Sequence, residues 1–316
     1  MRSNNPKLSV VVPTYNRVEM LKRVIEGILN QTFRDYETIV VDDGSTDVTE
    51  SVIRELIKKT PCELQYLKQV NKGAGAARNL GIKHAKGELV LFIDDDVLPT
   101  PGLIEEHVRA HQQYTGDNIA IVGSVVYSSE LNLSPFMQWL INSGIAFGHS
   151  REQNGAKLDY RSFCTANLSL KRCFVLEKGM FDENFRQFYD DIELGFRLEQ
   201  QGLQVVLAKN ALGYHLRGET VQGFCNRSKS YGQKSVLLYK KWPALKSSMN
   251  PTPQNIRTEF IEAAKKVILP IVIPVLRPAL CWLDSHDYAA RALLYALMLD
   301  YYSQVGYRKG IKSVGK

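Results

Sequence analysis

"KLSVVVPTYNRVEMLKRVIEGILNQTFRDYETIVVDDGSTD", residues 7–47, contains a strand, a helix and a second strand in succession. The apolar run Leu8–Val12 predicts a buried strand that stops at Pro13, because proline cannot donate a hydrogen bond to a neighbouring strand. Apolar residues then recur at helical spacing within 18–31, and a second apolar run ends at Asp42 in a turn. This unit predicts a helix that connects two parallel strands.

The same alternation of helix and strand continues beyond this unit, with predicted elements at 48–59, 62–69, 75–86, 87–96, 119–127 and 203–218. Strands that alternate with helices predict an α/β fold. We expect a doubly wound, mostly parallel sheet with helices on both faces. Sheets of this kind bind ligands beyond the carboxyl ends of their strands, so polar residues at those ends are the candidates for a site.

The length and composition are those of an ordinary globular protein. The 316 residues are 44% hydrophobic and 23% charged, and the length suits one large α/β domain with an appendage, or two modest domains. The five cysteines lie far apart with no C-x-x-C pair, which argues for a reducing compartment and against a disulfide framework or a zinc knuckle. No signal peptide is visible, because the first apolar run is too short. We predict a catalytic domain over 1–220 and a helical region over 221–316.

The charge is concentrated near the C-terminus. Residues 221–316 hold 15 Lys and Arg against 5 Asp and Glu, whereas the first 220 residues hold 25 against 28. A basic tail on a neutral-to-acidic body indicates an anionic surface as a partner, either phospholipid or nucleic acid. The tail lacks the interleaved aromatic residues of a recognised nucleic-acid module, which favours lipid and predicts no nucleic acid as partner.

The apolar segment Val267–Leu283 lies within this basic tail. It carries three prolines and Arg277, and its uncharged core of ten residues is too short for a bilayer, which needs about 20. One interpretation is a re-entrant segment or one that lies on the membrane surface, with Lys265, Lys266 and Arg277 beside lipid phosphates. The other is the buried core of a helical subdomain. The first predicts a cytoplasmic protein held peripherally on the inner face of the cell membrane.

Three predicted strand ends carry polar side chains: Thr14–Asn16, Asp42–Asp43 and Asp94–Asp96. The last, in "FIDDDV", brings three like charges together. The triplet is either a solvated acidic turn or a site where Asp94 and Asp96, which point the same way, hold a hard divalent cation. A cation would also offset the repulsion among the three carboxylates.

Four other motifs are each ambiguous when taken alone. "VVDDGSTD" is ordinary turn chemistry or a buried carboxylate that accepts an N–H from a base. "KGAGAARN" is not a dinucleotide fingerprint, because Arg78 stands in place of the third glycine; its small residues let a helix begin close to the sheet, with Arg78 aimed at an anion. "FYDDIELGF" is an acidic helix N-terminus or a general base. His215 is a lone structural histidine, the commoner case, or a metal ligand.

The order of these motifs is more specific than any one of them. "VVPTYNR", "VVDDGSTD", "KGAGAARNLGIKHAKGELVLFIDDD", "TANLSLKR", "GMFDENF" and "YDDIELGFRL" follow one another along the chain. In this order the motifs resemble those of a family 2 glycosyltransferase of the GT-A fold. The resemblance covers roughly residues 7–217.

The resemblance implies roles for individual residues. Pro13 to Asn16 would border the nucleotide base, and Asp43 would accept its N–H. Arg78 would face the nucleotide or its diphosphate, and Asp94 the ribose. The residues implied to bind the donor are Pro13, Tyr15, Asn16, Asp43, Arg78, Asp94, Asp95 and Asp190. Asp96, with His215 as an extra ligand, would bind Mg²⁺ or Mn²⁺, and Asp191 would be the catalytic base.

The implied reaction is an inverting, metal-dependent transfer of a sugar from a nucleotide-diphosphate donor to a hydroxyl acceptor. The acceptor would be a glycan or a lipid-linked molecule in polysaccharide or glycolipid biosynthesis. The alternative is an inactive, membrane-bound partner subunit that only binds a nucleotide sugar. The presence of Asp43, Asp96 and Asp191 speaks against that alternative.

Overall fold

The computed structural model describes residues 5–59, 64–145, 152–249 and 292–314, together with Pro270 and Ile273. The described residues form two compact units. The first contains 5–131 and 152–217, and the second contains 132–145 and the described residues after 217. Our predicted division at residue 220 lies close to the last point at which the chain passes from the first unit to the second, after Arg217. Residues 132–145 were not expected to belong with the C-terminal helices.

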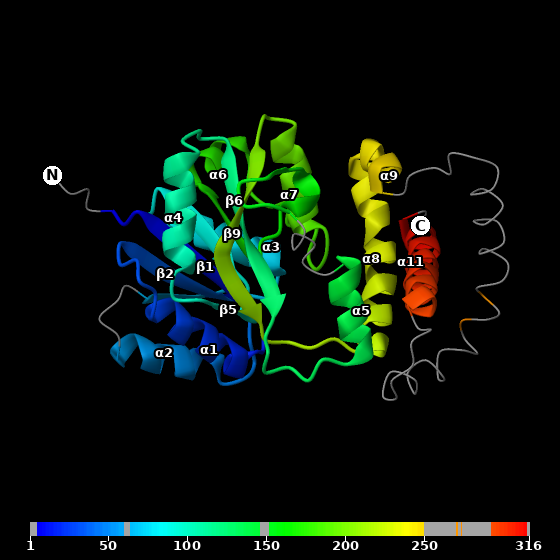
Figure 1. Cartoon of the computed structure of the whole chain (residues 1–316), viewed down its shortest axis with the longest axis horizontal. Helices are drawn as coiled ribbons and strands as arrows, with labels where there is room; N and C mark the ends of the chain where they lie inside the picture. The colour runs from blue at the N-terminus through cyan, green and yellow to red at the C-terminus, as the bar shows by residue number, and fades with distance from the viewer. Residues whose placement is uncertain are drawn as a thin grey trace. The chain divides into compact units, whose positions relative to one another are not determined.

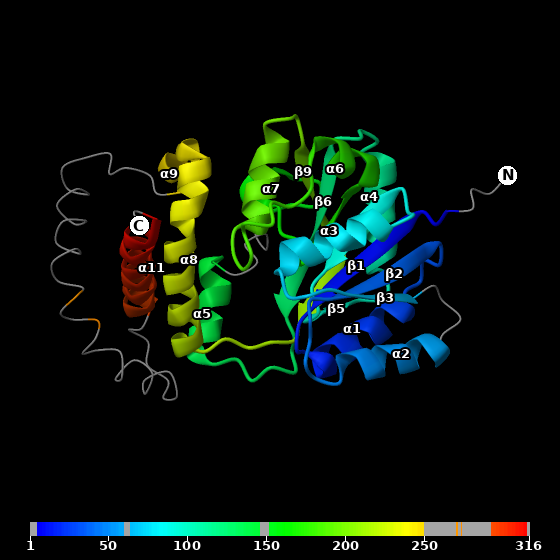
Figure 2. The ribbon, with the colours of Figure 1, turned by 180° about the vertical axis from the view of Figure 1, so that it is seen from behind.

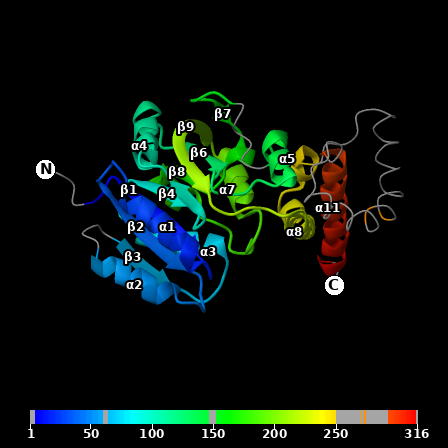
Figure 3. The ribbon, with the colours of Figure 1, turned by 60° about the horizontal axis from the view of Figure 1, so that its bottom comes forward.

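A nine-stranded sheet is the centre of the first unit, and its main order is β3-β2-β1-β4-β8-β6-β9-β5 (Figure 3). The strands are β1 Leu8–Thr14, β2 Tyr36–Asp42, β3 Leu64–Lys68, β4 Leu89–Ile93, β5 Val97–Pro99, β6 Ile119–Tyr127, β7 Lys157–Leu158, β8 Asn167–Lys171 and β9 Gln204–His215. The short strand β7 pairs with β9 off this path. Strands β3, β2, β1 and β4 are mutually parallel, as predicted.

Helices cover both faces of this sheet. The helices of the first unit are α1 Val18–Leu29, α2 Thr49–Lys59, α3 Ala74–His84, α4 Leu103–Gln113, α6 Arg172–Lys178 and α7 Asp190–Glu199, with the 3₁₀ turn η1 Tyr160–Ser162. Alternation along β1 divides the core: Val10 and Val12 pack with α1, α2 and α4, whereas Val11 packs with α3, α6 and α7. Figure 2 shows α3 on one side of β1 and β2, with α1 and α2 on the other. The α/β, mostly parallel fold is therefore confirmed.

Two features of the sheet differ from the expectation. Strand β8 lies antiparallel between β4 and β6, and it was not predicted. Strand β1 continues through Pro13 to Thr14, so the prediction that the strand stops at Pro13 is wrong. Proline is tolerated there because β1 pairs with β4 only up to Val11, while Pro13 keeps its register with β2.

The described part of the second unit is helical, which agrees with the predicted C-terminal helical appendage. It contains α5 Pro135–Ser143, α8 Val221–Lys241, α9 Pro243–Met249 and α11 Ala292–Val314. Figure 1 shows α8 and α11 side by side. A Cβ added at Gly232 would lie 1.9 Å from the carbonyl oxygen of Ser303, and one at Gly306 would lie 1.8 Å from that of Lys229. Glycine therefore permits the close contact of the two backbones.

Within the described residues, none of the helices combines the length and the apolar character that crossing a bilayer requires. Most of Val267–Leu283, the segment interpreted above as membrane-associated, lies outside the described residues.

Candidate active site

The three predicted strand ends meet at one edge of the sheet. The backbone N–H of Asp43 donates to the carbonyl oxygen of Thr14 at 2.9 Å, which joins the ends of β2 and β1. The hydroxyl of Thr14 donates to Oδ2 of Asp95 at 2.8 Å, which joins β1 to the acidic triplet after β4. Parallel pairing thus gathers residues that are distant in the sequence, as expected for an open α/β sheet.

The loop after β1 is held by Asn16. Its Oδ1 accepts the backbone N–H of Thr46 at 2.8 Å, and its own N–H donates to Oγ of Ser45 at 2.9 Å. Asn16 has a φ of +52°, which asparagine tolerates better than most residues. Tyr15 beside it is 46% exposed, whereas Pro13 is buried. Asn16 is exposed as well, so Tyr15 and Asn16 are the two of these residues that have surface available to a ligand.

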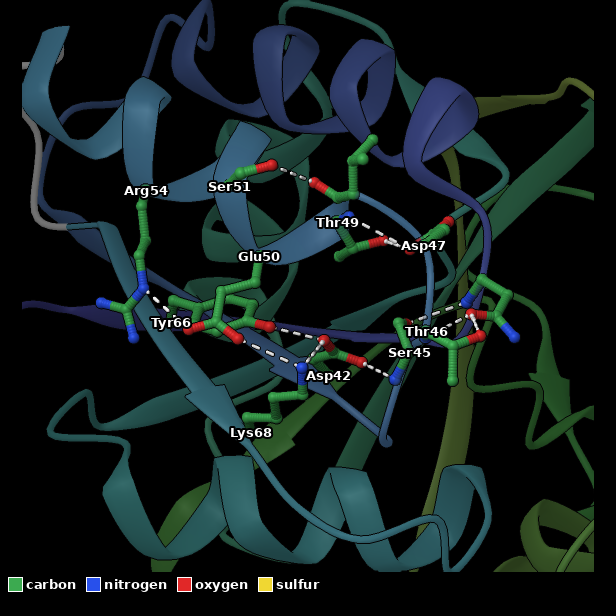
Figure 4. A network of polar contacts seen from close by, with 12 residues as sticks. Asp42, Ser45, Thr46, Asp47, Thr49, Glu50, Ser51, Arg54, Tyr66 and Lys68 are labelled. Carbon is green, nitrogen blue, oxygen red and sulfur yellow. Dashed lines mark hydrogen bonds and ion pairs between the residues drawn. The ribbon is translucent and has the colours of Figure 1, made fainter.

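The neighbouring residues Asp42 and Asp43 form hydrogen bonds with different loops. Asp42 is fully buried, and its carboxylate accepts the N–H of Ser45 at 2.7 Å and the hydroxyl of Tyr66 (Figure 4). Burial and the bond to Asp42 raise the pKa of the Tyr66 hydroxyl. Lys68 lies 3.9 Å from the same carboxylate. Asp42 therefore fixes the β2–α2 loop to β3.

Asp43 instead holds the loop that leads into α3. Its Oδ1 accepts the side-chain amide of Gln69 and the N–H of Lys72, and its Oδ2 accepts the N–H of Gly73, each at 2.8 Å. A carboxylate has about four acceptor positions, so one remains for a base N–H. The predicted role in base binding stays a prediction, and the structure adds a loop-fixing role.

The side chain of Arg17 contacts the acidic triplet Asp94–Asp96, and the sequence did not predict this contact. Its Nη1 donates to Oδ1 of Asp95 at 2.8 Å and to Oδ2 of Asp96 at 3.0 Å. Burial raises the pKa of both carboxyl groups to about 6, and neighbouring carboxylates add to the effect while Arg17 opposes it. The guanidinium thus offsets much of the repulsion within the triplet. The only indication in the sequence was a basic residue directly after "PTYN".

Arg78 connects the triplet with the second acidic pair. Its Nη2 donates to Oδ1 of Asp94 at 2.7 Å and its Nη1 to Oδ2 of Asp190 at 2.9 Å. Arg78 is 5% exposed, and its Nε is buried with no hydrogen-bond partner. The pKa of Asp190 is nevertheless raised, because burial outweighs the attraction of Arg78. Arg78 was predicted to face an anion. In the structure, the anionic groups that it contacts are the carboxylates of Asp94 and Asp190.

Close packing brings the N-termini of α3 and α7 together. Gly73, with φ +97°, precedes α3, and a Cβ there would lie 2.2 Å from the carbonyl oxygen of Arg186. Tyr189, at the start of α7, has φ +67°, and a left-handed conformation of this kind costs a bulky residue about 1–3 kcal/mol. Among the described non-glycine residues, only Tyr189 and Asn16 have positive φ, and both flank the candidate site.

Asp191 has the properties of a general base. Burial raises its pKa to about 7, the charge of Asp190 adds to the shift, and Arg78 opposes it. Its Oδ1 accepts the N–H of Ile192 at 2.8 Å. A base is most effective when its pKa lies near the working pH, because it is then both largely deprotonated and a strong proton acceptor.

Asp96 and His215 form a candidate metal site. Strand β5 pairs with β9 so that Val97 lies opposite His215, which brings Nε2 of His215 to 3.6 Å from Oδ1 of Asp96. Nδ1 of His215 lies 2.8 Å from the carbonyl oxygen of Arg217, which can only accept a hydrogen bond. Nδ1 therefore carries a proton, and Nε2 is directed toward Asp96, an arrangement common for metal-binding histidines.

This donor set fits a divalent cation that is shared with a substrate. No group of three or more His, Cys, Asp or Glu side chains in the described parts of the chain is arranged to hold a metal. Mg²⁺ is usually bound through one or two carboxylates together with substrate phosphates, and carboxylate oxygen also suits Mn²⁺. Asp96 and His215 supply one carboxylate and one imidazole, which suffice for a cation that substrate phosphates also bind.

The fold and the site together define a class: a GT-A type α/β domain with an acidic triplet after β4 and an acidic pair at the start of a later helix. The family model described as glycosyl transferase family 2 matches residues 9–179. The chain therefore belongs to glycosyl transferase family 2.

Curated relatives agree with this assignment. The chain is 39% identical over 184 residues to GalNAc(5)-diNAcBac-PP-undecaprenol beta-1,3-glucosyltransferase of Campylobacter jejuni, covering 57% of this chain and 56% of the relative. It is 27% identical over 267 residues to chondroitin synthase of Escherichia coli, covering 75% and 38%. It is 34% identical over 246 residues to the minor teichoic acid biosynthesis protein GgaB of Bacillus subtilis, covering 76% and 26%. The chain thus spans only part of each relative.

Solved structures share the fold. The mannosyltransferase PcManGT from Pyrobaculum calidifontis, in complex with GDP-Man and Mn²⁺, matches with a TM-score of 0.61 at 20% identity, over 98% of this chain and 88% of that one. Staphylococcus aureus TarS in complex with UDP-GlcNAc matches with a TM-score of 0.53 at 16% identity, over 96% and 92%. The GT-A resemblance inferred from the sequence is confirmed.

Proposed function

We propose that this glycosyltransferase moves a sugar from a nucleotide-diphosphate donor to a hydroxyl acceptor in one inverting, metal-assisted step. The observation that carries the proposal is the contact of one buried arginine, Arg78, with both Asp94 and Asp190. That contact joins the acidic triplet, the proposed donor side, to the acidic pair that contains the proposed base.

The donor side comprises the three gathered strand ends. Tyr15, Asn16 and Asp43 border the nucleotide base, with the remaining acceptor position of Asp43 open to a base N–H. Asp94 faces the ribose, and Asp95 keeps Thr14 and Arg17 in place. The partly exposed Arg17 adds positive charge beside the diphosphate.

Asp96 and His215 hold Mg²⁺ or Mn²⁺ in this proposal. When bound, the cation stabilises the negative charge that develops on the departing diphosphate, which is otherwise a poor leaving group. The structure of PcManGT contains GDP-Man and Mn²⁺, and that of GalNAc-T7 contains UDP, GalNAc and Mn²⁺. These complexes support the choice of a divalent cation without deciding between the two metals.

Asp191 accepts the proton of the acceptor hydroxyl as that oxygen attacks the anomeric carbon. The proton ends on the Asp191 carboxylate, the bond to the nucleotide diphosphate breaks, and attack from the opposite face inverts the configuration. Asp190, paired with Arg78, raises the pKa of Asp191 and so strengthens it as a base. No covalent intermediate is required.

The acceptor is a glycan or a lipid-linked molecule in polysaccharide or glycolipid synthesis. The named activities of the Campylobacter glucosyltransferase and of GgaB support this setting. A membrane-linked acceptor suits a protein held peripherally on the inner face of the cell membrane, and the basic C-terminal region supports such a location.

Hydrolysis of donors tests the proposal without knowledge of the acceptor. Purified full-length protein is incubated with UDP-, GDP- and dTDP-sugars and Mg²⁺ or Mn²⁺, and release of the nucleoside diphosphate is measured with and without a chelator. We expect release from one donor class, loss of release with the chelator, and a released sugar of inverted anomeric configuration by NMR. Chelator-resistant turnover would contradict the metal, and retained configuration would contradict the single displacement.

Two variants supply matched controls. Asp96→Asn removes the proposed metal carboxylate at nearly constant size and should abolish turnover at ordinary Mn²⁺ concentrations. Glu177→Gln makes the same chemical change at a side chain that is 69% exposed and outside the site, and it should retain the wild-type rate.

A further inference from the structure

A buried polar chain crosses the core on the α4 side of the sheet. His107 and Asn167 are at most 1% exposed, Ser169 is fully buried, and His111 is 4% exposed. Nδ1 of His107 lies 2.8 Å from Oγ of Ser169, and its Nε2 lies 2.8 Å from Oδ1 of Asn167. Nε2 of His111 lies 3.0 Å from the same Ser169 oxygen. The proposed mechanism uses none of these groups.

The donor and the acceptor of each hydrogen bond in this buried polar chain can be assigned. The amide nitrogen of Asn167 donates to the carbonyl oxygens of Ala211 at 2.8 Å and Ser124 at 3.2 Å, because carbonyls only accept. Its Oδ1 must then accept from Nε2 of His107. Burial lowers the pKa of His107 to about 4, so the ring is neutral and its Nδ1 accepts from Ser169. His111 donates to Ser169.

Asn167 is the last residue of this buried polar chain, and it lies where the pairing of β6 and β9 is irregular. Gly123 pairs with Ala208, but the next residue, Ser124, pairs with Leu212, so residues 209–211 bulge out of β9. A Cβ added at Gly123 would lie 2.2 Å from the amide nitrogen of Asn167. The glycine therefore leaves room for the asparagine to reach both strands at the bulge.

The bulge decides where His215 points. Beyond it, β6 and β9 regain a regular register, in which Tyr127 lies opposite His215, and the two rings pack edge to face at 5.4 Å. Side chains alternate between the faces of a sheet, so shifting the register of a strand by an odd number of residues turns those that follow to the opposite face. If residues 209–211 were paired with β6 instead of bulging, the register would shift by three, and His215 would leave its position opposite Tyr127 and face away from Asp96.

We infer that His107 and Asn167 are positioning residues for the metal site: His107 orients Asn167, and Asn167 fixes the bulge that presents His215 to Asp96. This inference rests on the proposed function, because it takes Asp96 and His215 as the metal ligands. Asn167 also lies opposite Ile93, and the carbonyl of the preceding Ala166 accepts the N–H of Asp94 at 3.3 Å. The backbone at the start of β8 thus pairs with the end of β4, which leads into the acidic triplet, and the Asn167 side chain holds β9, which carries His215.

Binding of Mn²⁺ to the protein in the presence of UDP or GDP tests the inference, because the proposed site shares its cation with a diphosphate. Free Mn²⁺ is measured by electron paramagnetic resonance against the same mixture without protein. His107→Leu removes the donor to Asn167, and Asn167→Asp removes both donors to the bulge. We expect each to weaken Mn²⁺ binding by about 10–100-fold, the loss typical of groups that orient metal ligands. His107→Gln retains a donor and an acceptor and should recover most of the affinity.

Ser169→Ala is the matched control. It breaks the same buried chain but leaves the bonds from His107 to Asn167 and from Asn167 to the bulge, so Mn²⁺ affinity should stay within about twofold of wild type. Near-UV circular dichroism confirms that each variant is folded, and Asn167→Ser replaces Asn167→Asp if the latter does not fold.

The outcomes separate the two proposals. If the wild type binds no Mn²⁺, or if Asp96→Asn does not weaken binding, the proposed metal site is wrong and the inference is overturned with it. If the wild type and Asp96→Asn behave as expected but the His107 and Asn167 variants bind Mn²⁺ like wild type or like Ser169→Ala, the positioning role alone is overturned.

Discussion

Arg78 donates to Asp190 at 2.9 Å, and the two residues lie 112 positions apart in the chain. The same guanidinium contacts Asp94, so a single buried cation serves a carboxylate of the acidic triplet and one of the acidic pair. Both ends of the proposed reaction, departure of the nucleotide and removal of the acceptor proton, therefore depend on one side chain.

Arg78→Gln should destabilise the protein. Its side chain is 6% exposed and that of Asp190 is 12% exposed, so the substitution leaves a buried carboxylate without its cation, at a cost of about 3–5 kcal/mol. Urea unfolding measures the change. Arg109→Gln is the control, because its pair with Glu105 is 61% and 47% exposed and should be worth no more than about 1 kcal/mol. Equal effects of the two substitutions would contradict the role of Arg78.

Asp191 should impose an acid limb on the reaction. With a pKa raised to about 7, it is protonated below that pH and cannot accept the proton of the acceptor, so the rate should rise with pH and level off above about 7. Asp191→Asn should lower kcat by about 10²–10⁴-fold and remove this limb. Initial rates from pH 5.5 to 9 with saturating metal check both points, and an unchanged profile in the variant would exclude Asp191 as the base.

His107 should contribute a pH dependence to stability. Burial lowers its folded-state pKa from 6.5 to about 4, so the unfolded chain binds more protons between these values. The free energy of unfolding from this group is therefore fully present above pH 6.5 and falls as the pH drops toward 4. His107→Gln should reduce the slope by up to about 1.4 kcal/mol per pH unit, measured by urea unfolding at several pH values.

Other titratable groups with shifted pKa values also change the free energy of unfolding with pH. The raised pKa values of Asp95, Asp96 and Asp191 act in the opposite direction, but they cancel when His107→Gln is compared with wild type. Burial also lowers the pKa of His111, which acts in the same direction as His107 and is present in both proteins. A His107→Gln slope equal to that of wild type would show that the buried ring does not titrate on unfolding.

Gly306→Ala should destabilise the C-terminal helical unit. The added Cβ would lie 1.8 Å from the carbonyl oxygen of Lys229 in α8, so the helices must separate, and overpacking of this kind costs about 1–3 kcal/mol or more. Gly223→Ala in α8 is the control, since its nearest neighbour would be the hydroxyl of Thr220 at 3.1 Å and alanine favours helix. Thermal unfolding should distinguish them; equal midpoints would contradict the close crossing.

The sequence by itself determined that β1, β2, β3 and β4 are strands of a parallel sheet and that the acidic motifs lie at strand ends, but not the order of the strands in the sheet. These follow from local patterns: apolar runs of strand length, helical spacing between them, and polar turn residues after each strand. The sequence did not predict that β1 continues through Pro13. Whether a strand tolerates proline there depends on how far β4 extends beside β1, which is not a local property of the sequence.

Only the tertiary structure decided which charges meet. Arg17 joins Asp95 and Asp96, Arg78 joins Asp94 and Asp190, and His107 reaches Asn167, each through packing of elements that are far apart in the chain. The pKa of Asp191 is also a tertiary property, because it depends on burial and on the neighbouring charges. Local sequence patterns carry no information about such distances, so they identify the carboxylates but not the cations that offset them.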